Sequence, residues 1–169
     1  VGPDALLVNF KSVRFRFAPA AVGDAVSVTA DPALPQVAIG QTPAPVDGPC
    51  GDWREAANAT WILQPRAAAV SFPGRFSREC GERDWYIALL DHPNYVHGIY
   101  RAAFEATGGL FGGAERDGRA PARAEPTATL LSPPLHEIVR DINKFSNNVM
   151  AQQLFLTLAA ATMPPPATS

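Results

Sequence analysis

The stretch that most constrains the fold is residues 135–158, which contains two helical runs separated by a short polar pause. In the first run, apolar side chains recur at helical spacing and charged side chains take the opposite face, which predicts an amphipathic helix. Its apolar positions are Leu135, Ile138, Val139, Ile142 and Phe145. The second run, from Val149 to Leu158, is apolar on nearly all sides, so we expect it to lie deep in a core.

The pause between the two runs is Ser146-Asn147-Asn148. In an unbroken helix Ser146 and Asn148 would lie about 200° apart, at ~100° per residue, and could not reach a common site. Ser and Asn prefer caps and turns to helix interiors, so we expect the helix to break here, with Ser146 capping the second run. Taken alone, S-x-N is most simply a polar cap that joins two packed helices.

The sequence around the pause resembles a known family. Residues 141–158, DINKFSNNVMAQQLFLTL, resemble the segment that carries the second active-site motif, S-x-N, of the class C low-molecular-mass penicillin-binding proteins. These proteins form the D-alanyl-D-alanine carboxypeptidase/endopeptidase family, peptidase family S13. The resemblance continues upstream, in the family's order, through residues 7–10, 50–53, 80–85 and 132–135.

The resemblance implies a serine peptidase that works through an acyl-enzyme. In this family the Ser of an S-x-x-K motif is the nucleophile, its Lys is the base, and S-x-N and K-T-G line the cleft. By resemblance, Ser146 relays a proton between that Lys and the leaving amide nitrogen, and Asn148 hydrogen-bonds the acyl side-chain amide of the substrate. A hydroxyl can both donate and accept, and a carboxamide offers both functions from one rigid group. We expect no cofactor.

Two of the three motifs are absent from this chain. None of its seven serines has a lysine three residues later, and neither Lys11 nor Lys144 begins K-T-G. The chain also begins at Val1 without a Met or signal sequence and ends in a proline-rich stretch at residues 163–166. We therefore expect an internal fragment that is inactive by itself, from a parent that cleaves peptidoglycan stem peptides and binds beta-lactams. The alternative is a non-catalytic cell-wall-binding or scaffold module of the same shape.

Composition excludes several other classes. With 169 residues, of which 47% are hydrophobic, the chain can form a core. Its net charge of −2 favours no particular partner, and its arginines are scattered rather than clustered as nucleic-acid binding requires. No stretch approaches 18 apolar residues, so we expect no transmembrane segment. The resemblance implies an exported, periplasmic bacterial protein. An exposed apolar face on the helix pair should promote self-association.

We expect an α+β fold. By resemblance, residues 1–123 belong to beta-rich accessory domains with one helix near residues 94–107, and residues 124–169 to the helical part of a beta-lactamase/transpeptidase-like domain. Alternating or apolar runs predict strands near residues 13–17, 25–30, 37–39, 61–63, 69–72 and 84–90, with further candidates at 6–10 and 110–113. Asp91 and Pro93 are typical of a helix start, and Gly108-Gly109 of its end.

Two cysteines and two small polar clusters remain. Cys50 and Cys80 alone leave free thiols possible, but the implied export favours a disulfide, whose loop of about thirty residues would be worth ~3–4 kcal/mol. His92 and His97 straddle a helix start, a poor geometry for a metal without a placed carboxylate. The carboxylates Glu79, Glu82, Asp84 and Asp91 lie beside turns, where such groups are usually solvated. We expect neither a metal site nor acid–base chemistry there.

Overall fold

The computed structural model describes residues 1–19, 25–116, 118 and 121–162. The chain divides into two compact units, one formed by Val8–Glu115 and the other by Val1–Leu7 with Arg116–Ser169. The first unit holds the described strands and two helices, and the second holds two more helices. This mixture confirms the predicted α+β class. The proline-rich residues 163–166 lie outside the described part of the chain.

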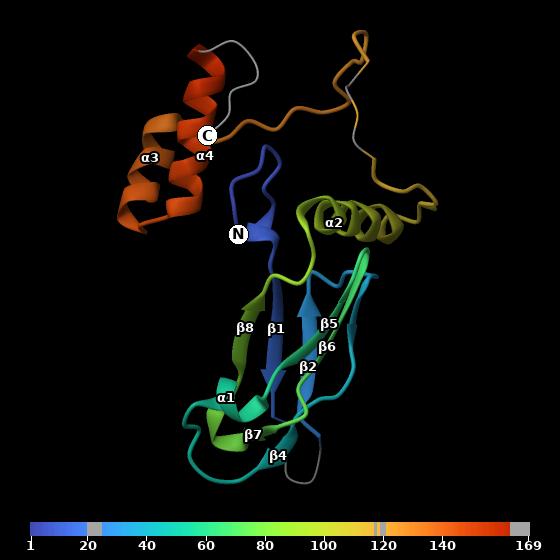
Figure 1. The fold of residues 1–169 in the computed structure, drawn as a ribbon, viewed down its shortest axis with the longest axis vertical. Helices are drawn as coiled ribbons and strands as arrows, with labels where there is room; N and C mark the ends of the chain where they lie inside the picture. The colour runs from blue at the N-terminus through green and yellow to red at the C-terminus, as the bar shows by residue number, and fades with distance from the viewer. Residues whose placement is uncertain (20–24, 117, 119–120, 163–169) are drawn as a thin grey trace. The chain divides into compact units, whose positions relative to one another are not determined.

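The unit Val8–Glu115 is built around β1 (Val13–Ala18). Its sequence VRFRFA alternates, so that Val13, Phe15 and Phe17 are buried on one face while the arginines take the other. β1 pairs antiparallel with β2 (Ser27–Asp31) on one side and β8 (Arg83–Ile87) on the other (Figure 1). The strand with the clearest alternation of apolar and polar residues, β1, is thus the central strand of this sheet.

A second sheet follows the order β3-β6-β5. β6 (Ala67–Ser71) lies between β3 (Val37–Ile39), which is parallel to it, and β5 (Thr60–Gln64), which is antiparallel. The strands predicted near residues 61–63 and 69–72 are confirmed, and they pair in this sheet. β5 is an edge strand whose side chains are all exposed, including Trp61, Ile62 and Leu63.

A third, two-stranded sheet pairs β4 (Ala44–Val46) with β7 (Arg75–Ser77) in parallel. β4 is not among the strands that the sequence predicted, since the prolines at residues 43 and 45 disfavour a strand. Pro45 has no N–H to give to a ladder, so it is tolerated only because β4 has a partner on one side alone.

Aromatic side chains fill the space between the sheets. The ring of Phe17 lies 4.8 Å from that of Phe72, 5.5 Å from Phe76 and 5.3 Å from Trp53, centroid to centroid. Trp53 begins the short helix α1 (Trp53–Ala57), whose N-terminus is capped by the Asp52 side chain. Pairs at these separations contribute about 0.5–1.5 kcal/mol each beyond their buried area.

Cys50 and Cys80 form a disulfide, with an S–S distance of 2.05 Å. Cys80 lies at the end of a short 3-10 helix, η2 (Arg78–Cys80), just before β8, and Cys50 lies just before α1. The bond therefore ties the entry to α1 to the connection between β7 and β8. This confirms the pairing that the family resemblance implied.

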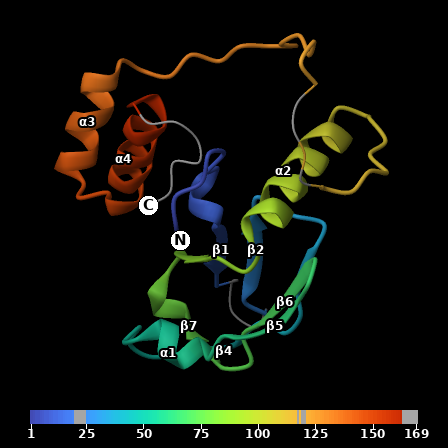
Figure 2. The same cartoon turned by 45° about the horizontal axis from the view of Figure 1, so that its top comes forward.

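The helix α2 (His92–Ala106) lies across one end of the strands of this unit (Figures 1 and 2). As predicted, Asp91 caps it by accepting from the backbone N–H of Asn94 at 3.0 Å, and Pro93 lies in the first turn. After Thr107 the chain turns at Gly108, whose φ of +87° favours glycine.

Two expected strands are absent from the described residues. Residues 6–10 lead into a 3-10 turn, η1 (Asn9–Lys11), in which all three residues have positive φ. Residues 110–113 have no partner strand, and Phe111 instead packs against α2, with its ring 5.3 Å from that of Tyr100. In both segments the conformation is fixed by contacts with α2 rather than by a local sequence pattern.

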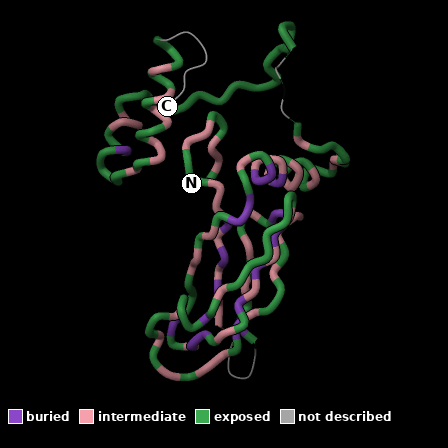
Figure 3. Tube along the Cα trace, in the orientation of Figure 1, coloured by how far each residue is buried: buried purple, intermediate pink, exposed green. Residues whose placement is uncertain are grey.

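The second unit contains α3 (Leu135–Lys144) and α4 (Asn148–Thr162), which lie side by side (Figures 1 and 2). Ile142 of α3 is buried, whereas no described residue of α4 is (Figure 3). Phe155 is 66% exposed and Leu158 55% exposed. The prediction that the second helix lies deep in a core is wrong for this chain, because α4 is apolar all round and α3 covers only part of it. No described helix is both long and apolar enough to cross a membrane.

Candidate functional site

The predicted break at the S-x-N motif is present, and α3 ends there in a definite turn. The N–H of Ser146 donates to the carbonyl of Asn143 at 3.4 Å, and the N–H of Asn147 donates to the carbonyl of Ile142 at 3.0 Å. This pair of backbone bonds is the Schellman arrangement, in which the residue after the helix adopts a left-handed conformation. Ser146 is that residue, with φ of +49°.

A serine at this position is unusual. The left-handed position that follows a helix is most often glycine, because any side chain with a Cβ meets the following carbonyl oxygen there. The conformation costs an L-residue about 1–2 kcal/mol. The fold therefore holds Ser146 in a conformation that its side chain disfavours, as it also does Asn58 and residues 9–11. Strain of this kind clusters at functional sites but is not confined to them.

The second helix is capped by the residue after Ser146. The side-chain oxygen of Asn147 accepts from the N–H of Met150 at 3.1 Å, and its carbonyl accepts from the N–H of Ala151 at 3.0 Å. The prediction that Ser146 caps this helix is therefore wrong. The signal was available, because Asn immediately before a helical run is among the preferred caps.

The turn leaves both motif side chains exposed and unused. Ser146 precedes the cap, Asn148 is the first residue of α4, and both are exposed. No described residue hydrogen-bonds to either side chain. Since Asn147 performs the capping, the hydroxyl of Ser146 and the carboxamide of Asn148 keep their full capacity to donate and accept.

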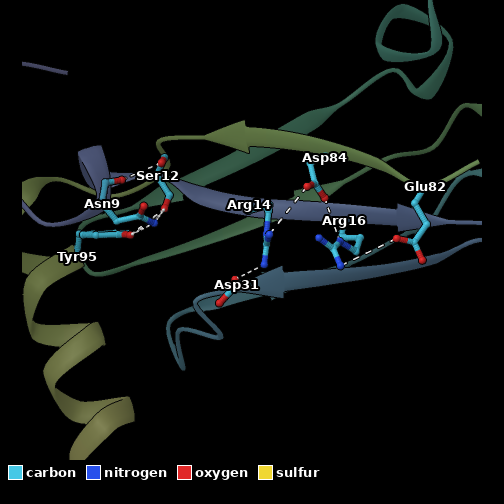
Figure 4. A network of polar contacts seen from close by, with 8 residues as sticks. All are labelled: Asn9, Ser12, Arg14, Arg16, Asp31, Glu82, Asp84 and Tyr95. Carbon is cyan, nitrogen blue, oxygen red and sulfur yellow. Dashed lines mark hydrogen bonds and ion pairs between the residues drawn. The ribbon is translucent and has the colours of Figure 1, made fainter. Parts of the chain in front are cut away.

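A separate polar network covers the exposed face of the sheet β2-β1-β8 (Figure 4). Arg16 donates from Nε to Asp84 Oδ1 at 3.1 Å and lies 4.0 Å from Glu82, while Arg14 contacts Asp31 and lies 3.9 Å from Asp84. The hydrogen bond from Arg16 holds the pKa of Asp84 below its ordinary value, and the same bond raises the pKa of Arg16. Glu82 and Asp84 thus form ion pairs with arginines, which is a structural rather than an acid–base role.

The same figure shows how η1 is held in place. Tyr95 of α2 is completely buried, and its hydroxyl donates to the carbonyl of Ser12 at 2.7 Å, while the Asn9 amide donates to the Tyr95 oxygen at 3.2 Å (Figure 4). Burial raises the pKa of Tyr95. The Tyr95 phenol therefore stays neutral, and its hydrogen bonds link α2 to the residues that precede β1.

The described residues contain no group of three or more histidine, cysteine, aspartate or glutamate side chains arranged to hold a metal ion. His92 begins α2, and Asp91 is occupied as its cap. His97 lies a turn further along the helix, with Nδ1 3.2 Å from Glu115 Oε2. No local sequence pattern links His97 with Glu115, because Glu115 reaches the helix from a segment without regular structure.

The chain matches one known family along nearly all its length. The D-Ala-D-Ala carboxypeptidase 3 (S13) family model matches residues 2–169. No curated protein matches the chain significantly.

A solved structure of another protein is similar in fold. It is penicillin binding protein 4 (dacB) from Haemophilus influenzae, crystallised in complex with a novel beta-lactam, with a TM-score of 0.60 and 19% sequence identity over 94% of this chain. At that identity the likeness shows a shared fold. The match covers 36% of that protein, so this chain spans about a third of its length.

Proposed function

The chain belongs to the D-Ala-D-Ala carboxypeptidase 3 (S13) family, as its sequence predicted, and from this membership we propose that it is part of a serine-type peptidase that cleaves peptidoglycan stem peptides. In the full-length parent, Ser146 and Asn148 form one wall of the cleft, while the S-x-x-K and K-T-G motifs come from chain outside these residues. Residues 1–123 are accessory, and residues 124–169 belong to the transpeptidase-like domain. The parent acts in the periplasm.

The observation that carries this proposal is the conformation of Ser146. A left-handed serine, with no hydrogen-bonding partner for its hydroxyl among the described residues, contributes nothing to the stability of the turn that glycine would not. The cap that the turn needs is supplied by Asn147. A hydroxyl kept at this position is therefore best explained by the chemistry that it performs.

The proposed reaction uses the hydroxyl as a proton relay. The S-x-x-K serine loses its proton to the neighbouring lysine as it bonds to the carbonyl carbon of the peptide between two D-alanines. The tetrahedral intermediate then breaks its C–N bond, and the departing amine takes a proton that passes from the lysine through Ser146. Water hydrolyses the acyl-enzyme and restores the serine. Asn148 donates to and accepts from the acyl side-chain amide of the substrate, which holds the carbonyl in place for attack.

A second function is favoured by the absence of S-x-x-K and K-T-G from the sequence. Residues 1–169 could serve as a non-catalytic module that binds cell wall or presents a scaffold. The two functions predict different behaviour of the full-length parent, because a non-catalytic module would not be acylated by a beta-lactam.

Labelling with a fluorescent penicillin separates the two functions. We expect the full-length parent to be labelled and the chain of residues 1–169 not to be. Ser146→Ala in the parent should slow acylation about 100-fold or more, the usual effect of removing a positioned proton-transfer group. Ser132→Ala, which removes an exposed serine shortly before α3, is the matched control and should label like the wild type. An unlabelled parent would support the scaffold, and equal labelling of both variants would remove Ser146 from the mechanism.

A further inference from the structure

The unit Val8–Glu115 contains an open pocket of about 290 Å³ that the proposed peptidase function does not use. It lies where one face of α2 meets the turn between β5 and β6, the loop before β3 and the segment that follows α2. Its ionisable side chains are Arg66, His97, Arg101 and Glu115, and Gln36 and Asn94 provide amides. A pocket of this size is at the lower end of those that bind small molecules.

The walls of this pocket are fixed by buried hydrogen bonds. The side-chain amide of Asn94, which is only 7% exposed, donates to the carbonyl of Pro65 at 3.0 Å and so holds the β5–β6 turn against α2. Gln36 donates to the carbonyl of Asn94 at 2.8 Å and holds the loop before β3. Gln36 also lies so close to Gly98 that a Cβ there would come within 2.2 Å of Gln36 Nε2. Three elements are thus held together around one cavity before any ligand arrives.

A carboxylate already occupies this pocket. Glu115 Oε1 lies 3.2 Å from Arg66 Nη2, and Glu115 Oε2 lies 3.2 Å from His97 Nδ1. Each oxygen thus lies at ion-pair distance from a nitrogen of a different element, but Oε2 is buried and makes no hydrogen bond among the described residues. The carboxylate is therefore held by charge and position, with an acceptor oxygen that is still unpaired. The Arg66 side chain is 64% exposed while that of Glu115 is 21% exposed, so solvent reaches this ion pair from the arginine side.

The segment that carries Glu115 is attached mainly at one other point. The Phe111 ring lies 5.4 Å from that of His97 and 6.1 Å from that of Phe104. Between this aromatic contact and Glu115 the chain runs through Gly112, Gly113 and Ala114, which have little side chain to hold them. Glu115 can therefore leave its donors while Phe111 stays packed on α2.

We propose that this pocket is a binding site for the carboxylate of a small acylated amino acid or peptide, and that Glu115 is its built-in competitor. The ligand carboxylate takes the place of the Glu115 carboxylate between Arg66 and His97. Arg101, which pairs with Glu105 across one helical turn at 2.8 Å, supplies a second cation at the rim. The small side chains at Gly113 and Ala114 leave room for the ligand's acyl group.

The test uses the chain of residues 1–169 and N-acetyl-L-alanine as the probe, followed by chemical shifts of backbone amides. The matched control ligand is N-acetyl-L-alanine amide, which lacks the carboxylate. Glu115→Gln removes the competitor and should tighten binding of the acid about two- to fivefold, the effect of releasing the partly exposed ion pair with Arg66, without tightening binding of the amide. Arg66→Gln in the Glu115→Gln background should reverse the gain.

The shifted amides should lie at residues 36, 66, 94–101 and 113–115. The proposal is overturned if the acid and the amide bind alike, if Glu115→Gln does not tighten binding, or if the shifts fall on other residues. Should Glu115→Gln lose its folded spectrum, Glu115→Asp provides the second variant. Its shorter side chain cannot span Arg66 and His97, so it should also bind the acid more tightly than the wild type. This test does not involve Ser146, so its failure would leave the peptidase proposal standing.

Discussion

Ser146→Gly should stabilise the turn between α3 and α4 while it abolishes the chemistry assigned to the hydroxyl. At φ of +49° a residue with a Cβ loses about 1–2 kcal/mol, and glycine avoids that cost. Glycine loses about 0.5–1 kcal/mol more backbone entropy on folding than alanine does. The midpoints of these two ranges differ by about 0.75 kcal/mol, so Ser146→Gly should be more stable locally than Ser146→Ala by roughly that amount. Stability and activity should therefore change in opposite directions at one residue.

Amide hydrogen exchange on the chain of residues 1–169 measures the stability half of this prediction. Amides of α3 and α4 should exchange about two- to fivefold more slowly in Ser146→Gly than in Ser146→Ala, which corresponds to about 0.75 kcal/mol expressed as a ratio of opening constants. Fluorescent-penicillin labelling of the full-length parent measures the other half, and both variants should be slowed alike.

Asn58→Gly is the matched control, because Asn58 also has positive φ, at +52°, after the end of α1. It changes the same backbone term outside the motif, and labelling of the parent should be unaffected. Two results would refute the reasoning. If Ser146→Gly is no more protected than Ser146→Ala, Ser146 is not held in a left-handed conformation. If Ser146→Gly labels at the wild-type rate, the hydroxyl has no part in acylation.

Three further predictions concern the fold. Because Arg16 lowers the pKa of Asp84, the stabilisation from that pair is fully present above the ordinary aspartate pKa of 3.8 and is lost as the pH falls through the lowered pKa of the folded state. The difference in urea midpoint between wild type and Asp84→Asn should therefore be largest at pH 7 and shrink steadily below pH 3.8, and a difference that does not change with pH would contradict this. Replacing Cys50 and Cys80 together by serine should cost roughly 3–4 kcal/mol of unfolding free energy for a separation of 30 residues, and an unchanged urea midpoint would contradict this. Asn147→Ala should cost about 1 kcal/mol by removing the cap of α4, measured as faster exchange of the amides of the first turn; unchanged exchange would show that the cap adds nothing.

The sequence by itself predicted the elements that are fixed by interactions between residues a few positions apart. The alternation of β1 set its buried face, because successive side chains of a strand point to opposite sides. Asp91 and Pro93 set the start of α2, because capping and the fixed φ of proline act within one turn. The break at residues 146–147 was likewise visible in side chains that compete for backbone hydrogen bonds.

Tertiary structure decided the features whose partners are distant in sequence. Residues 9–11 form a turn rather than a strand because Asn9 and Ser12 bond to Tyr95, more than eighty residues away. Residues 110–115 follow α2 because Phe111 and Glu115 find ring and charge partners there. Such contacts leave no periodic pattern in the sequence, because each joins residues that are far apart along the chain.

The S-x-N motif shows both contributions at one site. The sequence by itself supplied the family, the break and the two residues that we propose to act in it. Only the three-dimensional structure decided that Asn147 caps α4 and that Ser146 takes the left-handed position, because the choice among neighbouring polar residues depends on which N–H groups the ends of the two helices leave unpaired. The Ser146 hydroxyl stays free of the helix end because Asn147 accepts the N–H at the start of α4 in its place.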